Sequence, residues 1–265
     1  MRYVRILLLY FEEVFEYRSR VLVWFLIGFI NSLIYFVFWK GSLTGSGSVA
    51  SPVSISDITS YYFFLIIAGA FLVVHIEEDV AYWDIQQGGL VKYLMKPFSY
   101  FRIKFLQELP WRVSQGLIGV FAFLLLVLAF GRFFRITQDP YIIMLAIIST
   151  LLALGMSFTF KMIVGILTIW ITDYSGLHQL VTVVFFIFAG FVIPLDYLPE
   201  ILHKIAMVLP FGYMIYYPIR AFQGLLSEHE LYSVIGIQAI WLFLLLGGYA
   251  FFWRKGMKAF TGVGQ

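Results

Sequence analysis

The sequence predicts an all-α integral membrane protein with six transmembrane helices. Two observations carry this prediction: the composition is too apolar for a soluble domain, and long apolar segments recur along the chain. Hydrophobic residues make up 62% of the 265 residues and charged residues only 12%, with a mean hydropathy of +0.91. Soluble domains average about 25% charged residues. We therefore expect one transmembrane domain, residues 1–265, organised by its membrane spans.

Six segments match or approach the length of a membrane span, which is about 20 apolar residues. Four of them reach that length, and the second and fifth are slightly short. The predicted spans are Val21–Trp39, Ser60–Ile76, Val113–Phe130, Tyr141–Phe160, Leu177–Ile193 and Val234–Trp253. The second span begins with a tyrosine pair, as expected for an aromatic belt at the membrane surface.

The N-terminal segment, residues 1–20, is too short and too charged to span a membrane. On a helix, its charged side chains gather within an arc of about 120° and most apolar side chains lie opposite. The charged set includes Arg5, Glu12, Glu13 and Glu16. This pattern predicts an interfacial helix whose apolar face contacts membrane lipid. The alternative is an ordinary amphipathic helix that packs on protein.

The distribution of Lys and Arg predicts that both termini lie in the cytoplasm, because cytoplasmic connections carry an excess of these residues. This orientation places thirteen of the 18 inside and five outside. Those inside are Arg2, Arg5, Arg18, Arg20, Lys92, Lys96, Arg102, Lys104, Arg112, Lys161, Arg254, Lys255 and Lys258. Those outside are Lys40, Arg132, Arg135, Lys204 and Arg220. We expect a multi-pass protein of the cell inner (plasma) membrane.

The segment 194–220 holds four of the eight prolines of the chain, Pro194, Pro199, Pro210 and Pro218. Proline interrupts helical hydrogen bonding, and irregular backbone at membrane depth needs cover from protein or from a water-filled cavity. We therefore predict short external helices that re-enter the membrane. A seventh full span is the alternative, but it would place the basic C-terminal residues outside.

The stretch 77–112 is rich in charge and is the predicted cytoplasmic loop. Asp84 and Gln87 resemble a capping box that opens a helix, and Lys96-Pro97 ends it. The predicted helix, Asp84–Lys96, carries an apolar face that Gly88-Gly89 interrupts. The apolar residues are Ile85, Leu90, Val91, Leu94 and Met95. A short helix with exposed apolar residues suits docking into a groove of a soluble partner. The alternative is a loop that folds back onto anionic lipid.

Several kinds of chemistry lack their usual sequence signals. The chain has no phosphate-binding loop of the G-x-x-x-x-G-K-[ST] type and no H-E-x-x-H or G-x-S-x-G motif. We predict no catalytic, cofactor or metal site, no enzymatic activity and no nucleic-acid partner. A cation site at His75 and Glu77–Asp79 is less favoured than an acidic cluster at a span end. Ionisable residues are almost absent from the predicted spans, which weighs against an ion-coupled secondary transporter or channel. That class remains the alternative function.

The stretch Asp84–Phe105 (DIQQGGLVKYLMKPFSYFRIKF) is similar to a loop of the permease subunits of type-2 ABC exporters. In that pattern an acidic or polar start leads through glycine and leucine, here Gly89 and Leu90. A basic-Pro-x-Ser turn follows, here Lys96-Pro97-Phe98-Ser99. The predicted interfacial helix, six spans and external re-entrant helices resemble the same family over nearly the whole chain.

The resemblance implies the permease subunit of an ATP-driven ABC exporter. Such a subunit forms the translocation path with a second permease copy or a paralogous permease. Two cytoplasmic ABC ATPase subunits would hydrolyse ATP, and their closure would push on the loop helix. The residues that the resemblance assigns to ATPase coupling are Asp84, Ile85, Leu90, Val91, Leu94 and Lys96.

Overall fold

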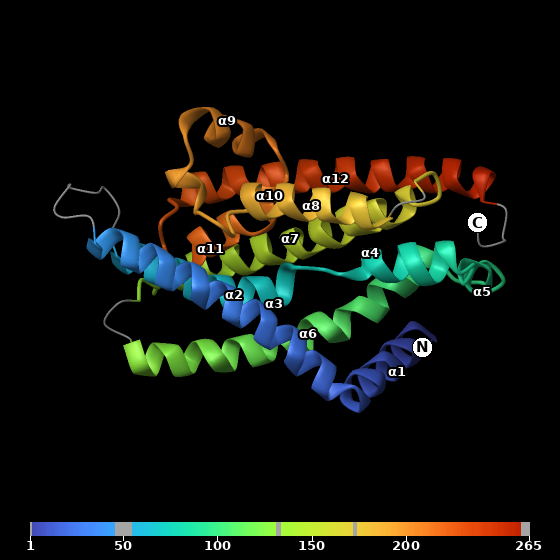
Figure 1. The fold of residues 1–265 in the computed structure, drawn as a ribbon, viewed down its shortest axis with the longest axis horizontal. Helices are drawn as coiled ribbons and strands as arrows, with labels where there is room; N and C mark the ends of the chain where they lie inside the picture. Colours follow the sequence, from blue (N-terminus) through green and yellow to red (C-terminus); the bar gives the residue numbers. More distant parts are fainter. Residues whose placement is uncertain (1, 46–54, 131–133, 172–173, 261–265) are drawn as a thin grey trace.

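The computed structural model describes residues 2–45, 55–130, 134–171 and 174–260 of the chain (Figure 1). Within these ranges all regular secondary structure is helical, which confirms the all-α prediction. Five helices are long and apolar enough to cross a membrane. They include α2 (Arg18–Gly45), α6 (Tyr100–Phe130), α7 (Pro140–Leu167) and α12 (Glu228–Ala259). The remaining candidate, Ser56–Gln86, contains α3 (Ile55–Leu72) and continues into the short helices that follow it. Each overlaps one of the predicted spans.

The predicted span Leu177–Ile193 corresponds to a shorter helix, α8 (Tyr174–Phe188), of 15 residues. The chain turns just after it at Gly190, whose φ of 89° is accessible to glycine without steric cost. A Cβ at this position would lie only 2.5 Å from the Tyr61 hydroxyl, so close packing also requires glycine there. The structure thus shows five long apolar helices and a shorter one, and the exact six-span arrangement stays a prediction.

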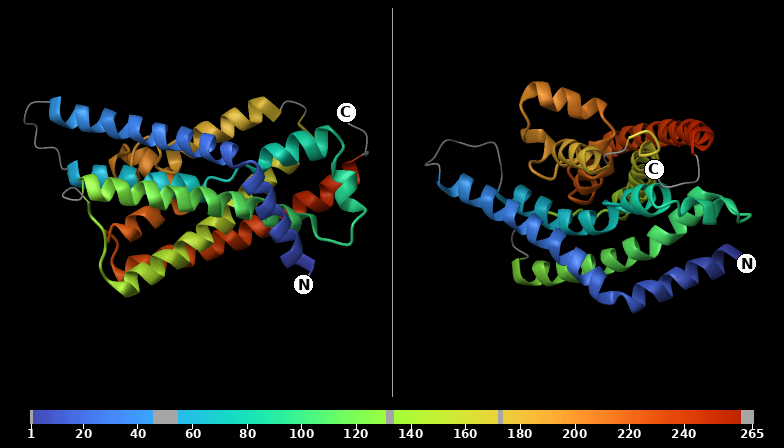
Figure 2. Two further views of the ribbon diagram at one scale, coloured as in Figure 1. Left: turned by 90° about the horizontal axis from the view of Figure 1, so that it is seen from below. Right: turned by 45° about the vertical axis from the view of Figure 1, so that its right-hand side comes forward.

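The long helices form two groups (Figures 1 and 2). In one group α3 lies against both α2 and α6; in the other α7 packs along α12. Helix α11 (Tyr216–Phe222) connects the groups because it contacts both α3 and α7. Helix α3 is the most deeply buried span, and its aromatic residues Tyr61 and Tyr62 are fully buried. This span therefore forms the centre of the molecule.

The N-terminal helix, α1 (Arg2–Glu16), is separated from α2 by Tyr17. The predicted helix 1–20 is therefore shorter than expected, and residues 18–20 begin the first span. The charged residues of its predicted polar face are all exposed: Arg5, Glu12, Glu13 and Glu16. Several apolar residues, among them Leu8, Leu9 and Phe15, are also exposed. Protein covers part of the predicted apolar face, however, because Val14 is buried, Ile6, Leu7 and Tyr10 are half-buried, and α1 packs against α6. The interfacial position of α1 therefore stays a prediction.

The proline-rich segment folds into short helices, as predicted. They are η3 (Leu195–Tyr197), α9 (Glu200–Val208), α10 (Phe211–Met214) and α11. Pro194, Pro199 and Pro210 each immediately precede a helix, and Pro218 lies in the first turn of α11. These are positions where proline removes no needed hydrogen bond. The described residues of this segment contain no helix long enough for a seventh span.

The predicted loop 77–112 is more helical than expected. The chain continues from α3 through α4 (Ile76–Glu78) and a π-helix, η1 (Asp79–Gln86), to α5 (Leu90–Leu94). Helix α6 already begins at Tyr100 and continues through Pro110. We call residues 79–99 the tip. Figure 1 shows the start of α1 and the end of α12 on the same side of the molecule as α5, whereas α9 lies toward the opposite side.

Candidate coupling site

The tip reverses direction at a glycine pair. Gly88 has a φ of 71°, a left-handed conformation that strongly favours glycine. A Cβ on Gly89 would lie 2.6 Å from the Trp83 carbonyl oxygen, and the Gly89 N–H donates to that oxygen at 3.1 Å. The predicted coupling helix Asp84–Lys96 is therefore divided between η1 and α5 at the glycine pair that was expected to interrupt it, and its coupling role stays a prediction. The glycines separate η1 from α5 because the turn requires both of them.

The sequence pattern predicted that Asp84 caps a helix, but the structure shows no such cap. Asp84 lies inside η1, where its carboxylate accepts a hydrogen bond from the Tyr100 hydroxyl at 2.5 Å. The same carboxylate pairs with the Lys104 ammonium at 2.6 Å. Both charged side chains are buried, so this ion pair ties the tip to α6. The Asp84 side chain therefore makes its contacts within this chain and is not available to a docking partner.

Aromatic contacts strengthen the same connection. The Tyr100 ring stacks on Trp253 of α12 with centroids 5.0 Å apart and meets Tyr93 of α5 edge-on at 5.4 Å. The Lys104 ammonium lies 4.8 Å from the Tyr93 ring centroid, a cation–π contact. Burial, with the charge of Asp84 nearby, raises the pKa of the Tyr93 phenol to about 12. Together, Asp84, Tyr93, Tyr100, Lys104 and Trp253 therefore connect η1, α5, α6 and α12.

The predicted coupling residues divide into two groups. Asp84, Ile85 and Leu90 are buried, whereas Val91 is half-buried and Leu94 and Lys96 are exposed. The most exposed apolar side chains of the tip include two aromatic residues that the sequence pattern did not select. We define the tip patch as Tyr82, Trp83, Leu94 and Met95. Met95 is 75% exposed and Trp83 is 61% exposed.

The second span is broken between α3 and α4, at residues 73–75. Arg112 of α6 donates to the carbonyl oxygens of Ala70, at 3.4 Å, and of Val73. Glu108, one turn earlier, accepts from the His75 N–H at 3.4 Å and pairs with Arg112 at 2.8 Å. These two buried side chains satisfy backbone groups that the break leaves without helical partners.

A second buried ion pair lies just beyond the break. Glu77 of α4 accepts a hydrogen bond from the Lys161 ammonium of α7, and His178 Nδ1 lies 3.6 Å from the same carboxylate oxygen. Nearby, a Cβ on Gly165 would lie 2.7 Å from the Val80 side chain, so α7 approaches the tip closely. Among the residues described, no group of acidic and histidine side chains is arranged to hold a metal ion.

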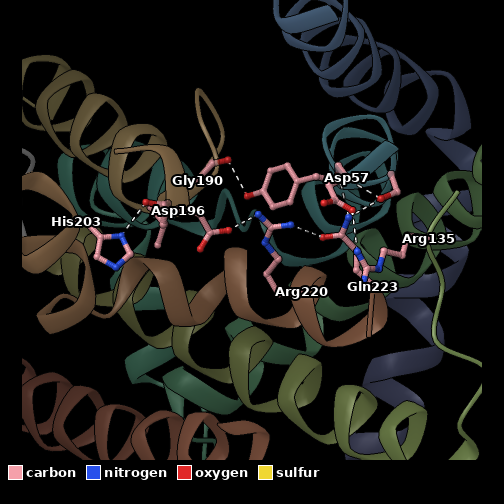
Figure 3. A network of polar contacts seen from close by, with 10 residues as sticks. Asp57, Arg135, Gly190, Asp196, His203, Arg220 and Gln223 are labelled. Carbon is pink, nitrogen blue, oxygen red and sulfur yellow. Dashed lines mark hydrogen bonds and ion pairs between the residues drawn. The ribbon is translucent and has the colours of Figure 1, made fainter. Parts of the chain in front are cut away.

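A further polar network joins the proline-rich segment to α3 on the opposite side (Figure 3). Arg220 pairs with Asp196 and donates to Gln223 Oε1 at 3.0 Å. The Gln223 amide in turn donates to Ser60 Oγ at 2.5 Å and to the Asp57 carbonyl at 3.1 Å. The segment is therefore anchored to the start of the second span.

Sequence reasoning missed both buried ion pairs at the break. It assigned Glu77 to an acidic exit from the span, and it assigned Arg112 and Lys161 to the cytoplasmic charge count. The available signals were a Glu–Arg pair at i,i+4 in Glu108 and Arg112 and a single lysine within an apolar stretch, Lys161. Neither signal identifies the partner on another helix.

Comparison of the sequence with known proteins identifies the family of this chain. Residues 21–264 match a family model described as ABC-2 family transporter protein. A search of curated proteins finds no match. The family match covers the tip, the broken span and every long apolar helix, so it applies to the whole site described above. The chain is a multi-pass membrane protein that belongs to the ABC-2 transporter family.

Proposed function

We propose that this chain is the permease subunit of an ATP-driven exporter. Two such subunits, identical or paralogous, would form the translocation path, and two cytoplasmic ABC ATPase subunits would bind their tips. The family match and the absence of a phosphate-binding loop from the sequence support this division of labour. ATP would be hydrolysed in the partner. This chain would transmit the partner's movement to its membrane helices and change their arrangement.

The observation that carries the proposal is the tip patch on a firmly held support. Its four side chains are exposed although they are apolar or aromatic, and such patches mark interaction surfaces. In the same tip, the Asp84–Lys104 pair and the Tyr100 stack provide connections to α6 and α12. A push on the patch would therefore reach two long helices without first deforming the loop.

The start of α1 and the end of α12 lie on the same side of the molecule as α5 (Figure 1), which supports a cytoplasmic tip. An even number of membrane crossings places the end of the last span on the side where the first span begins. The excess of Lys and Arg in the predicted inner connections favours the cytoplasmic side for this end. We therefore place the ATPase partners there.

Replacing Met95 or Trp83 by aspartate should abolish co-purification of the ATPase in mild detergent. The substitution introduces a charge at the centre of an apolar contact, where a hot-spot change costs about 2 kcal/mol or more, equivalent to at least a thirtyfold loss of affinity. The measurement is ATP hydrolysis recovered with the tagged permease.

The matched control is Ile201→Asp on α9. Ile201 is 76% exposed, as Met95 is 75% exposed, but it lies on the opposite side of the molecule (Figure 1). We expect full ATPase recovery with this variant. Equal recovery from the Met95→Asp and Ile201→Asp variants would refute docking at the tip. Leu90→Asp is a poor probe because Leu90 is buried, and the change would disturb folding first.

A further inference from the structure

A cavity of about 250 Å³ lies between α2, α3 and α8. We call it the apolar chamber. Aromatic side chains contribute much of its apolar wall, among them Trp24, Phe25, Phe185, Phe186 and Phe191, and Lys161 and His178 line it as well. Gly28 also lines it, and a Cβ at that position would meet no atom within 4 Å. The chamber therefore offers free space beside an aromatic surface, a setting that suits an apolar chain.

A second cavity of about 80 Å³ adjoins it toward α1 and α6. We call this the polar chamber. The two chambers share four lining residues, Trp24, His75, Glu78 and Gln115, so they lie directly beside each other. The polar chamber is located at the break in the second span, where Glu108 and Arg112 also line it.

Gln115 indicates that the site is built for a polar ligand. Its side chain reaches both chambers and is only 4% exposed. In the described part of the chain its amide makes no hydrogen bond, although a buried polar group normally has a partner. A headgroup in the polar chamber would supply the missing donor or acceptor.

The charges of the polar chamber favour a positively charged headgroup. Four carboxylates line it, those of Glu13, Glu78, Asp79 and Glu108, against the two guanidinium groups of Arg20 and Arg112. Glu108 and Arg112 neutralise each other at 2.8 Å. Three carboxylates and one guanidinium then remain, so the chamber attracts an amine more strongly than a phosphate or carboxylate alone.

We propose that the two chambers together bind a membrane amphiphile with an apolar chain and an amine-bearing headgroup. The chain would occupy the apolar chamber, and the headgroup would lie beside Gln115 and the acidic side chains. Ile27 and Gly28 at the chamber wall are exposed, so the ligand reaches the site sideways from the bilayer past α2. That this amphiphile is the transported substrate rests on the proposed exporter function.

The test is photolabelling of the permease alone in nanodiscs of phosphatidylglycerol. The probes are phosphatidylethanolamine and phosphatidylglycerol that carry the same diazirine-tailed acyl chain. We expect the amine-bearing probe to label peptides of α2 and α8 about tenfold more strongly, the effect of one hydrogen bond to a charged group. Equal labelling by the two probes would overturn the headgroup assignment.

The chamber itself is tested with Gly28→Trp, which should reduce labelling of α8 about tenfold because the indole fills the space that the chain needs. Gly247→Trp on α12 is the matched control, since a Cβ on Gly247 would also meet no atom within 4 Å and this residue lies outside both chambers. Unchanged labelling in the Gly28→Trp variant would refute the site.

The ATPase readout separates the two proposals. Gly28→Trp leaves the tip intact and should retain ATPase co-purification, whereas Met95→Asp should lose the ATPase and keep the amphiphile label. Loss of the label from the unaltered permease, with the ATPase still bound, would refute this inference alone. Labelling that persists while phosphatidylethanolamine fails to change the ATP hydrolysis rate of the complex would refute its role as substrate.

Discussion

Replacing Arg112 by methionine is expected to destabilise the protein by about 3–5 kcal/mol, because the change leaves Glu108 buried without its counter-charge. The same change removes the donor to the carbonyl oxygens of Ala70 and Val73, so backbone groups at the break lose their partner. For a chain of this size the loss corresponds to a decrease in Tm of roughly 10 °C. The measurement is thermal unfolding in detergent micelles.

The control is Arg135→Met, which also removes an arginine from an ion pair. Arg135 pairs with Asp57 at 3.2 Å, but its side chain is 52% exposed. Exposed pairs of this kind contribute at most about 1 kcal/mol, so we expect little change in Tm. If the two variants unfolded at the same temperature, Arg112 would not stabilise the break in the way described.

Replacing Asp84 by alanine should release the tip from α6. The Lys104 ammonium is almost completely buried and would lose its counter-charge, at a cost of about 3–5 kcal/mol. The Tyr100 hydroxyl would lose its acceptor as well. We expect amide hydrogens of residues 79–99 to exchange much faster, while the packed helices α7 and α12 keep their protection. Hydrogen–deuterium exchange with mass spectrometry measures both.

Lys92→Ala provides the comparison for this prediction, because Lys92 lies on α5 of the same tip but its side chain is exposed. Its exchange pattern should match that of the unaltered protein. In complex with the ATPase, Asp84→Ala should reduce stimulation of ATP hydrolysis more than it reduces binding. Fast exchange throughout the chain would instead mean that Asp84 stabilises the whole fold and not the tip alone.

The membrane helices could be predicted well from sequence because long apolar runs satisfy a simple physical requirement. A span must hide its backbone polar groups in its own hydrogen bonds and expose apolar side chains to lipid. Those conditions identify α2, α6, α7 and α12 without knowledge of their neighbours. The short helices after Pro194 were also predictable, since proline limits where each helix begins.

The break in the second span could not be predicted from its own residues. Val73 and Val74 are apolar, and the segment contains neither proline nor glycine. The break is stabilised by Glu108 and Arg112, which follow more than thirty positions later in the chain. Sequence pattern identifies local preferences, whereas this feature depends on side chains supplied by another helix.

The exposure of side chains in the tip was predicted only in part for a similar reason. The pattern identified an apolar stretch between Asp84 and Lys96 and its interruption at Gly88-Gly89, but not which side chains face inward on each side of the interruption. The turn at Gly88 and Gly89 changes which side chains face inward, so Leu90 is buried and Trp83 is exposed. Two helices separated by a glycine turn have different orientations. Helical periodicity counted across the turn therefore does not predict which side chains share a face.

The central claim is that the tip patch contacts a separate ATPase. The chain contains no cysteine, so a single cysteine introduced as Met95→Cys or Ile201→Cys carries a photocrosslinker at one defined place. After crosslinking in native membranes, the partner is tested for labelling by azido-ATP. We predict an ATP-labelled partner attached to position 95 and none attached to position 201. An ATP-labelled partner at position 201, or a partner at position 95 that does not bind ATP, would contradict this claim.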